Sequence, residues 1–344
     1  MTKITIFDIA KDSGVSYSTV SRVLNGFEFV KESTRQRVLD SANRLGYVAN
    51  LSARSLAGGR SNIIGIVVPG LDNGYIGEIV RGVDEELNRA SYDIMLYTTH
   101  RHQGRESAYI QQIANGLTEG VLIVVPLATT EYAEALREQN FPYVLIDQAD
   151  ALDRSWIVDC TNFQGAYEAT EYLIQLGHQR IGFITGLMQI ASASERLEGY
   201  KAALRDNNLP CDETLIVQGD YLQSSGYQAA QTLLALPQRP TAIFASNDLE
   251  ALGAMQAIRE HGLSIPDDIS LMGFDDIPQA SMTHPTLTTV RQPLDTMGRV
   301  AARLLLEHIE NPQKQPRRVT MATKLIVRDS CKSILIHQNN AERR

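Results

Sequence analysis

Within the first 60 residues, apolar side chains recur every three or four positions, the spacing of one face of a helix. The pattern predicts one helix over Ile6–Ser13, a second over Tyr17–Leu24 and a third that Ser33 caps and that runs through Tyr47. The residues of the third helix expected to face inward are Val38, Leu39, Ala42 and Leu45. The segment is therefore predicted to be entirely α-helical.

Polar residues mark where these helices begin and end. Thr5 and Asp8 have the spacing of a capping box, Gly14 is expected to end the first helix, and Ser16 is expected to cap the second. Three short helices with a tight turn between the first two are typical of a helix-turn-helix unit.

From Ile63 onward, short apolar runs alternate with longer amphipathic segments, which predicts parallel sheets covered by helices on both faces. The predicted strands are Ile63–Val68, Tyr92–Tyr97, Gly120–Val125, Tyr143–Asp147, Arg180–Ile184, Leu215–Gln218, Ala242–Ala245 and Ser270–Phe274. The predicted helices are Gly77–Arg89, Glu106–Asn115, Thr130–Glu138, Gly165–Leu176, Ser194–Asn207, Ser224–Leu234 and Leu249–His261. The expected fold is an all-α headpiece followed by two doubly wound α/β lobes.

Polar side chains follow several of these strands, where ligands bind in open parallel sheets. They are Asp72 and Tyr75, Asp147 and Gln148, Asn247 and Asp248, and Asp275 and Asp276. Carboxylates and amides that converge at one sheet edge suit a ligand with many hydroxyl groups. Each aspartate alone could equally anchor a loop, and Asp248 could cap the helix that follows it.

Composition narrows the class of protein. The chain has 344 residues, of which 43% are hydrophobic and 21% charged, as in ordinary globular proteins of two or three domains. It has no apolar run of 18 residues and no apolar signal core within Met1–Lys11, so we expect a cytoplasmic location and no membrane partner. Cys160, Cys211 and Cys331 lie far apart and are expected to be buried thiols. We expect neither a metal nor a cofactor.

Charge is distributed unevenly along the chain. The net charge of the whole chain is −8. Residues 1–60 nevertheless hold nine Lys/Arg and five Asp/Glu, whereas the remaining residues hold 23 Lys/Arg and 35 Asp/Glu. A basic head on an acidic body is expected where one end meets phosphate. The predicted second helix also presents Tyr17, Ser18, Ser21 and Arg22 without a carboxylate, which suits base edges and phosphates. The alternative is a small helical cap packed on a larger protein.

The segment from Ile6 to Gly26, IFDIAKDSGVSYSTVSRVLNG, closely resembles the headpiece of the lactose/galactose repressor (LacI/GalR) family. Later segments resemble the sensor core of the same family, so that the likeness covers roughly residues 4–330. These segments are LGHQRIGFI (176–184), RLEGY (196–200), SNDLEALG (246–253), GFDD (273–276) and PTLTTV (285–290).

The resemblance implies a site on DNA. It implies that Tyr17, Ser18 and Arg22 read bases in the major groove. The positions implied to hold mostly the DNA backbone are Ser16, Thr19, Ser21 and Asn25, and Thr5 is a further DNA-binding candidate. It further implies a hinge helix over Leu51–Gly58 that folds on DNA, with Leu56 as a minor-groove wedge and Ala53 allowing two such helices to approach. The alternative for this segment is an ordinary linker.

The resemblance also implies an effector cleft. Asp147, Arg196, Asn247 and Asp275 are implied to line it, and Tyr75 and Tyr221 to stack on the ligand. Trp156 and Phe163 are weaker candidates, for which burial in the core is equally expected. Ile190 stands where the purine-binding branch of the family has arginine, and no Lys/Arg cluster marks a phosphate site, so a neutral sugar is expected.

The predicted protein is therefore a transcriptional regulator, expected to be a repressor, that binds a pseudopalindromic operator in double-stranded DNA as a homodimer under allosteric control by a sugar. The predicted parts are a headpiece (1–49), a hinge and linker (50–61), a two-lobed core (62–334) and a flexible tail (335–344). Lobe 1 would comprise about 62–160 and 292–321, and lobe 2 about 161–291 and 322–334, with crossings near Asp159–Phe163, Val290–Pro293 and Thr320–Thr323.

Two other classes of protein are less consistent with the sequence. A sugar-binding transport protein would share the two-lobed core but would need export, and it would not need a helix-turn-helix. A hydrolase or dehydrogenase on a doubly wound sheet would be expected to carry a G-x-G-x-x-G, G-x-x-x-x-G-K-[ST] or G-x-S-x-G motif, and none occurs in the expected place. We therefore do not expect an enzyme.

Overall fold

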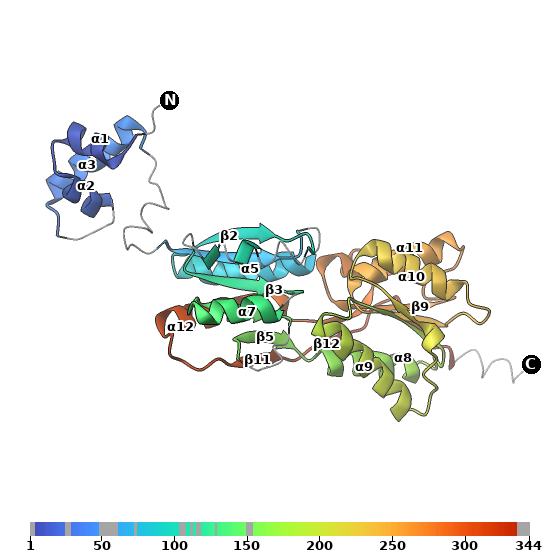
Figure 1. The fold of residues 1–344 in the computed structure, drawn as a ribbon. Coiled ribbons are helices and arrows are strands. Elements are labelled where there is room, and N and C mark those ends of the chain that lie inside the picture. The colour runs from blue at the N-terminus through green and yellow to red at the C-terminus, as the bar shows by residue number, and fades with distance from the viewer. Residues whose placement is uncertain are drawn as a thin grey trace, which may run out of the picture.

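In the computed structural model, a small helical headpiece precedes two α/β lobes (Figure 1). The structure describes residues 4–24, 29–47, 61–71, 74–102, 108–110, 113–114, 118–127, 129–148 and 154–335. Asn25, Asp72 and the predicted hinge helix with Ala53 and Leu56 lie outside these residues, as does half of the predicted helix Glu106–Asn115. Within the described parts, no helix is long and apolar enough to cross a membrane.

The headpiece consists of α1 (Ile6–Ser13), α2 (Tyr17–Leu24) and α3 (Glu32–Leu45), packed around Ile9, Val20 and Val38. The Asp8 carboxylate accepts hydrogen bonds from the Thr5 backbone N–H and hydroxyl at 2.8 and 2.7 Å, which fixes the start of α1. Ser16 Oγ likewise accepts from the Thr19 N–H at 3.2 Å. The bounds of α1 and α2 are those predicted.

Three predictions for α3 are wrong. The helix ends at Leu45 and not at Tyr47, because Gly46 adopts a left-handed backbone there (φ 65°). The helix begins before Ser33, because the Lys31 carbonyl accepts the first helical hydrogen bonds, from the N–H groups of Thr34 and Arg35. Leu39 is 37% exposed rather than buried. Since α1 and α2 cover the side of α3 that holds Val38 and Ala42, Leu39, which lies about 100° further around the helix from Val38, remains in solvent.

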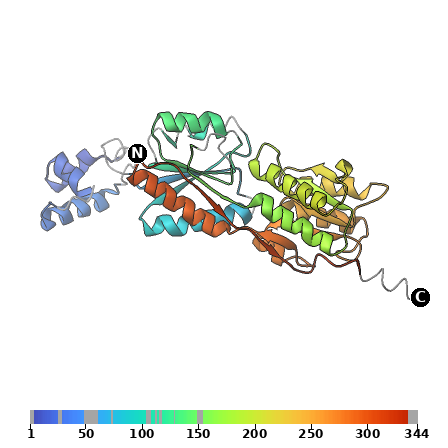
Figure 2. The same ribbon diagram turned by 90° about the horizontal axis from the view of Figure 1, so that it is seen from below.

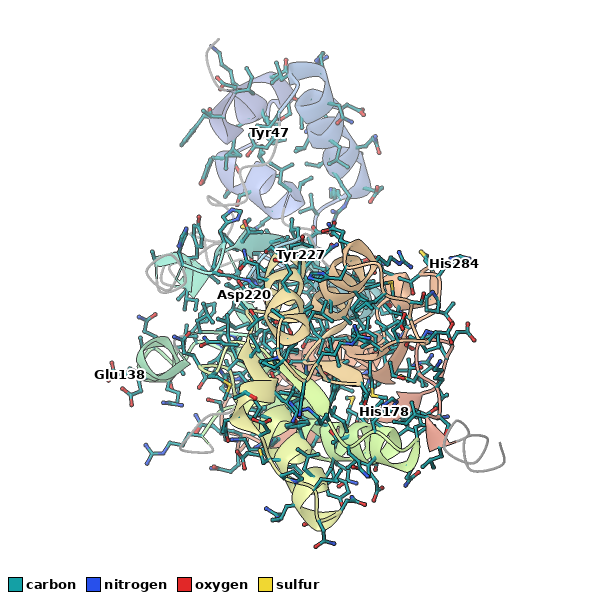
Figure 3. All side chains as sticks on the ribbon, turned by 90° about the vertical axis from the view of Figure 1, so that its right-hand side faces the viewer. Tyr47, Glu138, His178, Asp220, Tyr227 and His284 are labelled. Atoms are coloured by element: carbon teal, nitrogen blue, oxygen red, sulfur yellow. The ribbon has the colours of Figure 1, made fainter. Side chains whose placement is uncertain are left out.

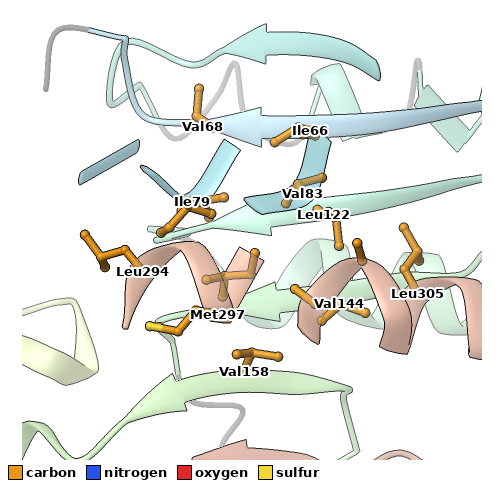
Figure 4. Packing of buried hydrophobic residues seen from close by; sticks show 14 of the residues in the cluster. Ile66, Val68, Ile79, Val83, Leu122, Val144, Val158, Leu294, Met297 and Leu305 are labelled. Carbon is orange, nitrogen blue, oxygen red and sulfur yellow. The ribbon is translucent and has the colours of Figure 1, made fainter. Parts of the chain in front are cut away.

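Lobe 1 is built on a parallel sheet of six strands. Their order is β11 (Arg318–Met321), β5 (Ile157–Cys160), β4 (Tyr143–Ile146), β3 (Gly120–Val124), β1 (Ile63–Val68) and β2 (Asp93–Thr98). Helices α5 (Gly74–Arg89) and α12 (Leu294–Glu310) cover one face, where Ile79 and Met297 pack on Ile66 and Leu122 (Figure 4). Helix α7 (Thr129–Glu138) covers the other face.

Lobe 2 repeats this design with a second sheet of six strands. Their order is β12 (Lys324–Ile326), β10 (Thr288–Arg291), β9 (Ser270–Asp275), β8 (Ala242–Ala245), β6 (Ile181–Thr185) and β7 (Ile216–Gln218). Helices α8 (Asn162–Gln175) and α9 (Ala191–Asp206) cover one face, and α10 (Gln223–Leu234) and α11 (Asp248–Glu260) the other. Two 3₁₀ helices, Glu213–Leu215 and Pro278–Ser281, complete the lobe. Among the described strands of this sheet, only β12 runs antiparallel to its neighbour, β10.

The chain passes between the two sheets three times, after β5, after β10 and after β11 (Figure 2). The second crossing, after β10, places α12 on lobe 1 although the preceding strands β9 and β10 belong to lobe 2. Leu335, which the sequence assigned to the flexible tail, lies beside Gly177 of lobe 2. The two-lobed α/β fold class is confirmed.

Several predicted helices begin too late. Helices α5, α8 and α9 each start three residues before the predicted first residue. The periodicity of apolar residues reports where a helix is buried, whereas its backbone hydrogen bonds already begin in the preceding turn. The prediction that all three cysteines are buried is also wrong, since Cys211 is exposed in the connection after α9.

Candidate effector cleft and DNA-binding face

A cleft lies between the two lobes, beyond the carboxyl ends of several strands of each sheet. All six predicted effector residues line it: Tyr75, Asp147, Arg196, Tyr221, Asn247 and Asp275. The other lining residues are Pro69, Ile76, Arg101, Val125, Leu127, Leu187 and Ile190. Its empty volume is about 520 Å³, including the solvent at its mouth.

Lobe 1 contributes a carboxylate at the end of β4. Asp147 is 4% exposed, and its left-handed backbone (φ 57°) turns the side chain toward the cleft. Its Oδ2 accepts a 2.9 Å hydrogen bond from the Tyr75 hydroxyl, while no described residue bonds the buried Oδ1. Burial raises the pKa of Asp147, and the Arg196 charge opposes that shift. Asp147 therefore keeps one buried acceptor for a ligand.

Lobe 2 contributes a fully buried guanidinium from α9. Arg196 donates from Nε to Asn162 Oδ1 at 2.9 Å and from a terminal nitrogen to the Ser246 carbonyl at 2.6 Å. Its guanidinium lies 3.8 Å from the centre of the Phe274 ring, a cation–π contact. These contacts hold the group in one orientation, because Arg presents its donors in a rigid plane.

Asp275 is the last residue of β9 and faces Arg196 across 3.7 Å. Its Oδ1 accepts a 2.6 Å hydrogen bond from the Gln292 amide. Burial raises the pKa of Asp275 to about 7, even though Arg196 and Gln292 favour the ionised form. A group that titrates near neutral pH donates or accepts hydrogen bonds according to its protonation, so it suits a hydroxyl partner.

The Tyr221 ring and the Asn247 amide complete the lobe 2 wall. Tyr221 has a left-handed backbone (φ 68°), and its hydroxyl lies 3.4 Å from Ser192 Oγ. Asn247 caps α11, since its Oδ1 accepts from the Glu250 N–H at 2.8 Å. The proposed capping role of Asp248 is therefore wrong. Its buried carboxylate instead accepts from Thr289 and from the Ile277 N–H.

The cleft also contains residues that the sequence did not indicate. Arg101, after β2, lines the cavity and donates to the Asp220 carbonyl of lobe 2. It follows a strand end, so the rule that found Asp147 could have found it.

The two weaker aromatic candidates do not line the cleft. Trp156 is buried in lobe 1 against His308, and Phe163 is 42% exposed.

The headpiece presents its candidate DNA-binding face on α2. Tyr17, Ser18 and Arg22 are exposed, and α2 carries no carboxylate. Ser16 Oγ lies 2.9 Å from Ser18 Oγ and 2.8 Å from Thr19 Oγ1, so one short hydroxyl network orders the start of the helix. Thr5 is exposed at the start of α1, and Ser21 is half-buried. Tyr47, at the end of the headpiece, is labelled in Figure 3.

One aromatic residue of this face was missed. Phe7 is 68% exposed and stacks on Tyr17, with ring centres 4.8 Å apart and 19° between the planes. The sequence could have indicated this exposure, because the helical spacing places Phe7 outside the apolar face of α1 that contains Ile9. An exposed aromatic pair next to a predicted recognition helix fixes the direction of the Tyr17 side chain.

A helix-turn-helix headpiece joined to a two-lobed, ligand-binding core defines the class of DNA-binding regulators that respond to a small molecule. The sequence profile described as "Bacterial regulatory proteins, lacI family" matches residues 5–50, and that of a "Periplasmic binding protein-like domain" matches residues 170–331. The chain belongs to the LacI family of bacterial regulatory proteins. It is a DNA-binding transcriptional regulator under ligand control and not an enzyme.

Similar proteins match over nearly the whole chain. Catabolite control protein A of Priestia megaterium is 33% identical over 330 residues, which cover 96% of this chain and 99% of that protein. The probable HTH-type transcriptional repressor ExuR of Bacillus subtilis (strain 168) is 36% identical over 338 residues, with 96% and 99% covered.

Solved structures show the same arrangement. The Lac repressor dimer bound to operator and the anti-inducer ONPF has a TM-score of 0.83 and 28% identity, with 96% of this chain and 100% of that chain covered. A complex of the transcriptional regulator CelR with cellobiose has a TM-score of 0.73 and 32% identity, with 95% and 100% covered.

Proposed function

We propose that this protein is a cytoplasmic repressor whose affinity for its operator is set by a neutral sugar bound between the lobes. The observation that carries the proposal is the buried set of Asp147, Arg196 and Asp275, in which fixed donors and acceptors face one cavity. A polyhydroxylated ligand satisfies such a set, because each hydroxyl both donates and accepts. The unbonded Oδ1 of Asp147 is the first position we assign to a sugar hydroxyl.

The wall of the cleft supports a sugar over a purine. Ile190 is 2% exposed and lines the cavity with an aliphatic side chain, so it offers no hydrogen bond to a base edge. Arg101 favours a second candidate, a sugar acid, because its guanidinium lies on the cavity wall. CelR binding cellobiose and a LacI-family regulator of Enterococcus faecium binding ribose are consistent with a sugar in this kind of cleft.

For DNA, we propose the division into headpiece (1–49), hinge (50–61) and core (62–334), with a dimer reading two half-sites of a pseudopalindrome. Tyr17, Ser18 and Arg22 would read bases, supported by their exposure on α2. Thr5, Ser16, Thr19, Ser21 and Asn25 would hold the DNA backbone, and Ala53 and Leu56 would act in the hinge. The similarity to the Lac repressor dimer on operator supports this arrangement.

The sugar acts on DNA binding only through a difference in its affinity for two arrangements of the dimer. The cleft is suited to produce such a difference, because Asp147 and Tyr75 belong to lobe 1 and Arg196 and Asp275 to lobe 2. A ligand that bridges them favours the closed arrangement of the lobes. The first lobes of the two subunits would then shift relative to each other and change the spacing of the hinge helices.

A thermal-shift screen of the purified protein tests the proposal. The compounds are mono- and disaccharides, sugar acids, sugar phosphates and nucleobases. A ligand at about 100 times its dissociation constant adds roughly 2.7 kcal/mol to the free energy of unfolding, which raises Tm measurably. We expect a sugar to do so, and Asp275→Ala to abolish the shift. Asp206→Ala, at the exposed end of α9 and not among the cleft residues, is the matched control. A response only to nucleobases would contradict the sugar assignment.

A further inference from the structure

Glu250 is a buried carboxylic acid that stands beside the effector cleft without lining it. It lies in the first turn of α11 and is 0% exposed. Its Oε1 accepts a 2.8 Å hydrogen bond from the backbone N–H of Tyr221, whose ring forms part of the cleft. A carboxyl group in the interior is costly unless it has a specific partner, so its placement behind a cleft residue calls for a role.

Tyr221 needs to be held, because its backbone adopts a left-handed conformation that bulky side chains disfavour (φ 68°). Helix α11 engages both of its backbone groups. Glu250 binds the N–H, and the Asn247 amide donates to the Tyr221 carbonyl at 3.1 Å. Asn247 Oδ1 in turn accepts from the Glu250 N–H at 2.8 Å, which closes a ring of hydrogen bonds. The start of α11 thus determines where the Tyr221 ring points.

The local sequence is adapted to this contact. A Cβ atom on Gly219 would lie 2.1 Å from Glu250 Oε1, so only glycine lets the carboxyl group approach the turn. The turn formed by residues 219–221 also meets lobe 1, because Arg101 donates to the Asp220 carbonyl. Asp220 is labelled on lobe 2 in Figure 3. A shift of this turn would therefore displace a cleft wall and a contact between the lobes together.

We propose that Glu250 is a positioning residue for effector binding: it fixes the 219–221 turn so that Tyr221 faces the cleft and the Asp220 carbonyl meets Arg101. It touches no ligand itself and acts through the Tyr221 backbone. This inference rests on the proposed function for its effect on sugar affinity. The hydrogen-bonded turn itself is a property of the ligand-free protein.

The test compares E250Q, which keeps an acceptor oxygen, with E250L, which removes it at similar volume. Hydrogen–deuterium exchange of the Tyr221 amide, resolved with overlapping peptides, reports on the turn without a ligand. Calorimetric titration with the sugar that gives the largest thermal shift reports on the cleft. Tyr200→Phe is the control, because it deletes a buried hydrogen bond of the same lobe, from the Tyr200 hydroxyl to the Ile181 carbonyl, away from the cleft.

We expect E250L to exchange the Tyr221 amide about tenfold faster and to bind the sugar about tenfold more weakly, the effect of one lost hydrogen bond. E250Q should stay within about threefold of the wild type in both measurements. Tyr200→Phe should lower Tm while leaving both unchanged.

Two results would overturn the proposal. Unchanged exchange at Tyr221 in E250L would show that Glu250 does not hold the turn. Faster exchange with unchanged sugar affinity would show that the turn does not govern binding. If the wild type binds no sugar, the proposed function fails, whereas the exchange at Tyr221 still decides whether Glu250 fixes the turn.

Discussion

The side-chain amide of Gln292 donates a 2.6 Å hydrogen bond to the carboxylate of Asp275. Gln292 lies in the segment that crosses from β10 to α12, and its Oε1 also accepts from the Cys160 thiol at the end of β5, beside a second crossing. Asp275 is thereby linked, through Gln292, to two of the segments that connect the lobes. A ligand that alters the hydrogen bonds of Asp275 acts directly on the connection between the lobes.

The first prediction concerns pH and stability. Burial raises the pKa of Asp275 to about 7 in the folded protein, against an ordinary value of 3.8. Between these values the folded state binds the proton more readily, so the stabilisation is present below about pH 4 and is lost as the pH rises through about 7. Asp275→Asn removes this titration. Thermal denaturation over that range should show the Tm of the wild type falling relative to that of the variant. A constant difference would contradict the raised pKa.

The second prediction concerns the Tyr221 ring. A Cβ atom at position 186 would lie 2.0 Å from this ring, so Gly186→Ala must displace it from its place on the cleft wall. We expect sugar affinity to fall by about tenfold, the effect of losing one well-packed contact. Titration calorimetry measures this change. Gly77→Ala is the control, because a Cβ atom there meets open space, and its affinity should equal that of the wild type.

The third prediction concerns base reading. Arg22 is exposed on α2, and a bidentate contact from arginine to a guanine edge contributes about 1–3 kcal/mol of discrimination. Arg22→Ala should lower affinity for an operator selected from random DNA while binding to scrambled DNA is nearly retained. Fluorescence anisotropy on both duplexes measures the difference. Arg37→Ala, an exposed arginine of α3, should preserve the preference. Equal discrimination in Arg22→Ala and the wild type would refute the role.

The fourth prediction concerns the stacked pair on the headpiece. Removing the Phe7 ring frees Tyr17, and such stacking contributes about 0.5–1.5 kcal/mol. Phe7→Ala should therefore weaken operator binding, by less than Tyr17→Ala does. Its Tm should change little because Phe7 is 68% exposed. Anisotropy titrations and thermal melts check both parts. Phe29→Ala, which removes a ring that is 99% exposed, provides the comparison. A loss equal to that of Phe29→Ala would exclude the stacking role.

Local signals explain why much of the fold could be predicted. The starts of α1 and α2 follow from Asp8 and Ser16, whose side chains accept hydrogen bonds from backbone N–H groups three residues away. The start of α3 could not be placed in this way, because Lys31 offers only its carbonyl and leaves no side-chain signature. Short-range hydrogen bonds are encoded in neighbouring residues, whereas an uncapped helix start is not.

The same distinction between local and distant contacts separates the cleft residues that the sequence could identify from those that it could not. Asp147 and Asp275 could be found because they stand at the carboxyl ends of apolar strands, and the ends of parallel strands meet at one edge. Glu250 and Gln292 could not, since nothing near them in sequence shows that the carboxyl group meets Tyr221 or that the amide meets Asp275. The assignment of a helix cap to Asp248 failed for the same reason, because its partners Thr289 and Ile277 are distant along the chain.

By itself, the sequence determined the class of the protein: periodicity and capping residues specify a helix-turn-helix followed by two α/β lobes, and the headpiece motif specifies the family. Only the tertiary structure decided which polar residues share the cleft, which of them remain unbonded, and how Glu250, Gln292 and Arg101 support them. The physical reason is how far apart along the sequence the interacting residues lie. Periodicity and caps arise from interactions over a few residues, whereas burial, a raised pKa and a left-handed Tyr221 arise from contacts between segments that the sequence separates.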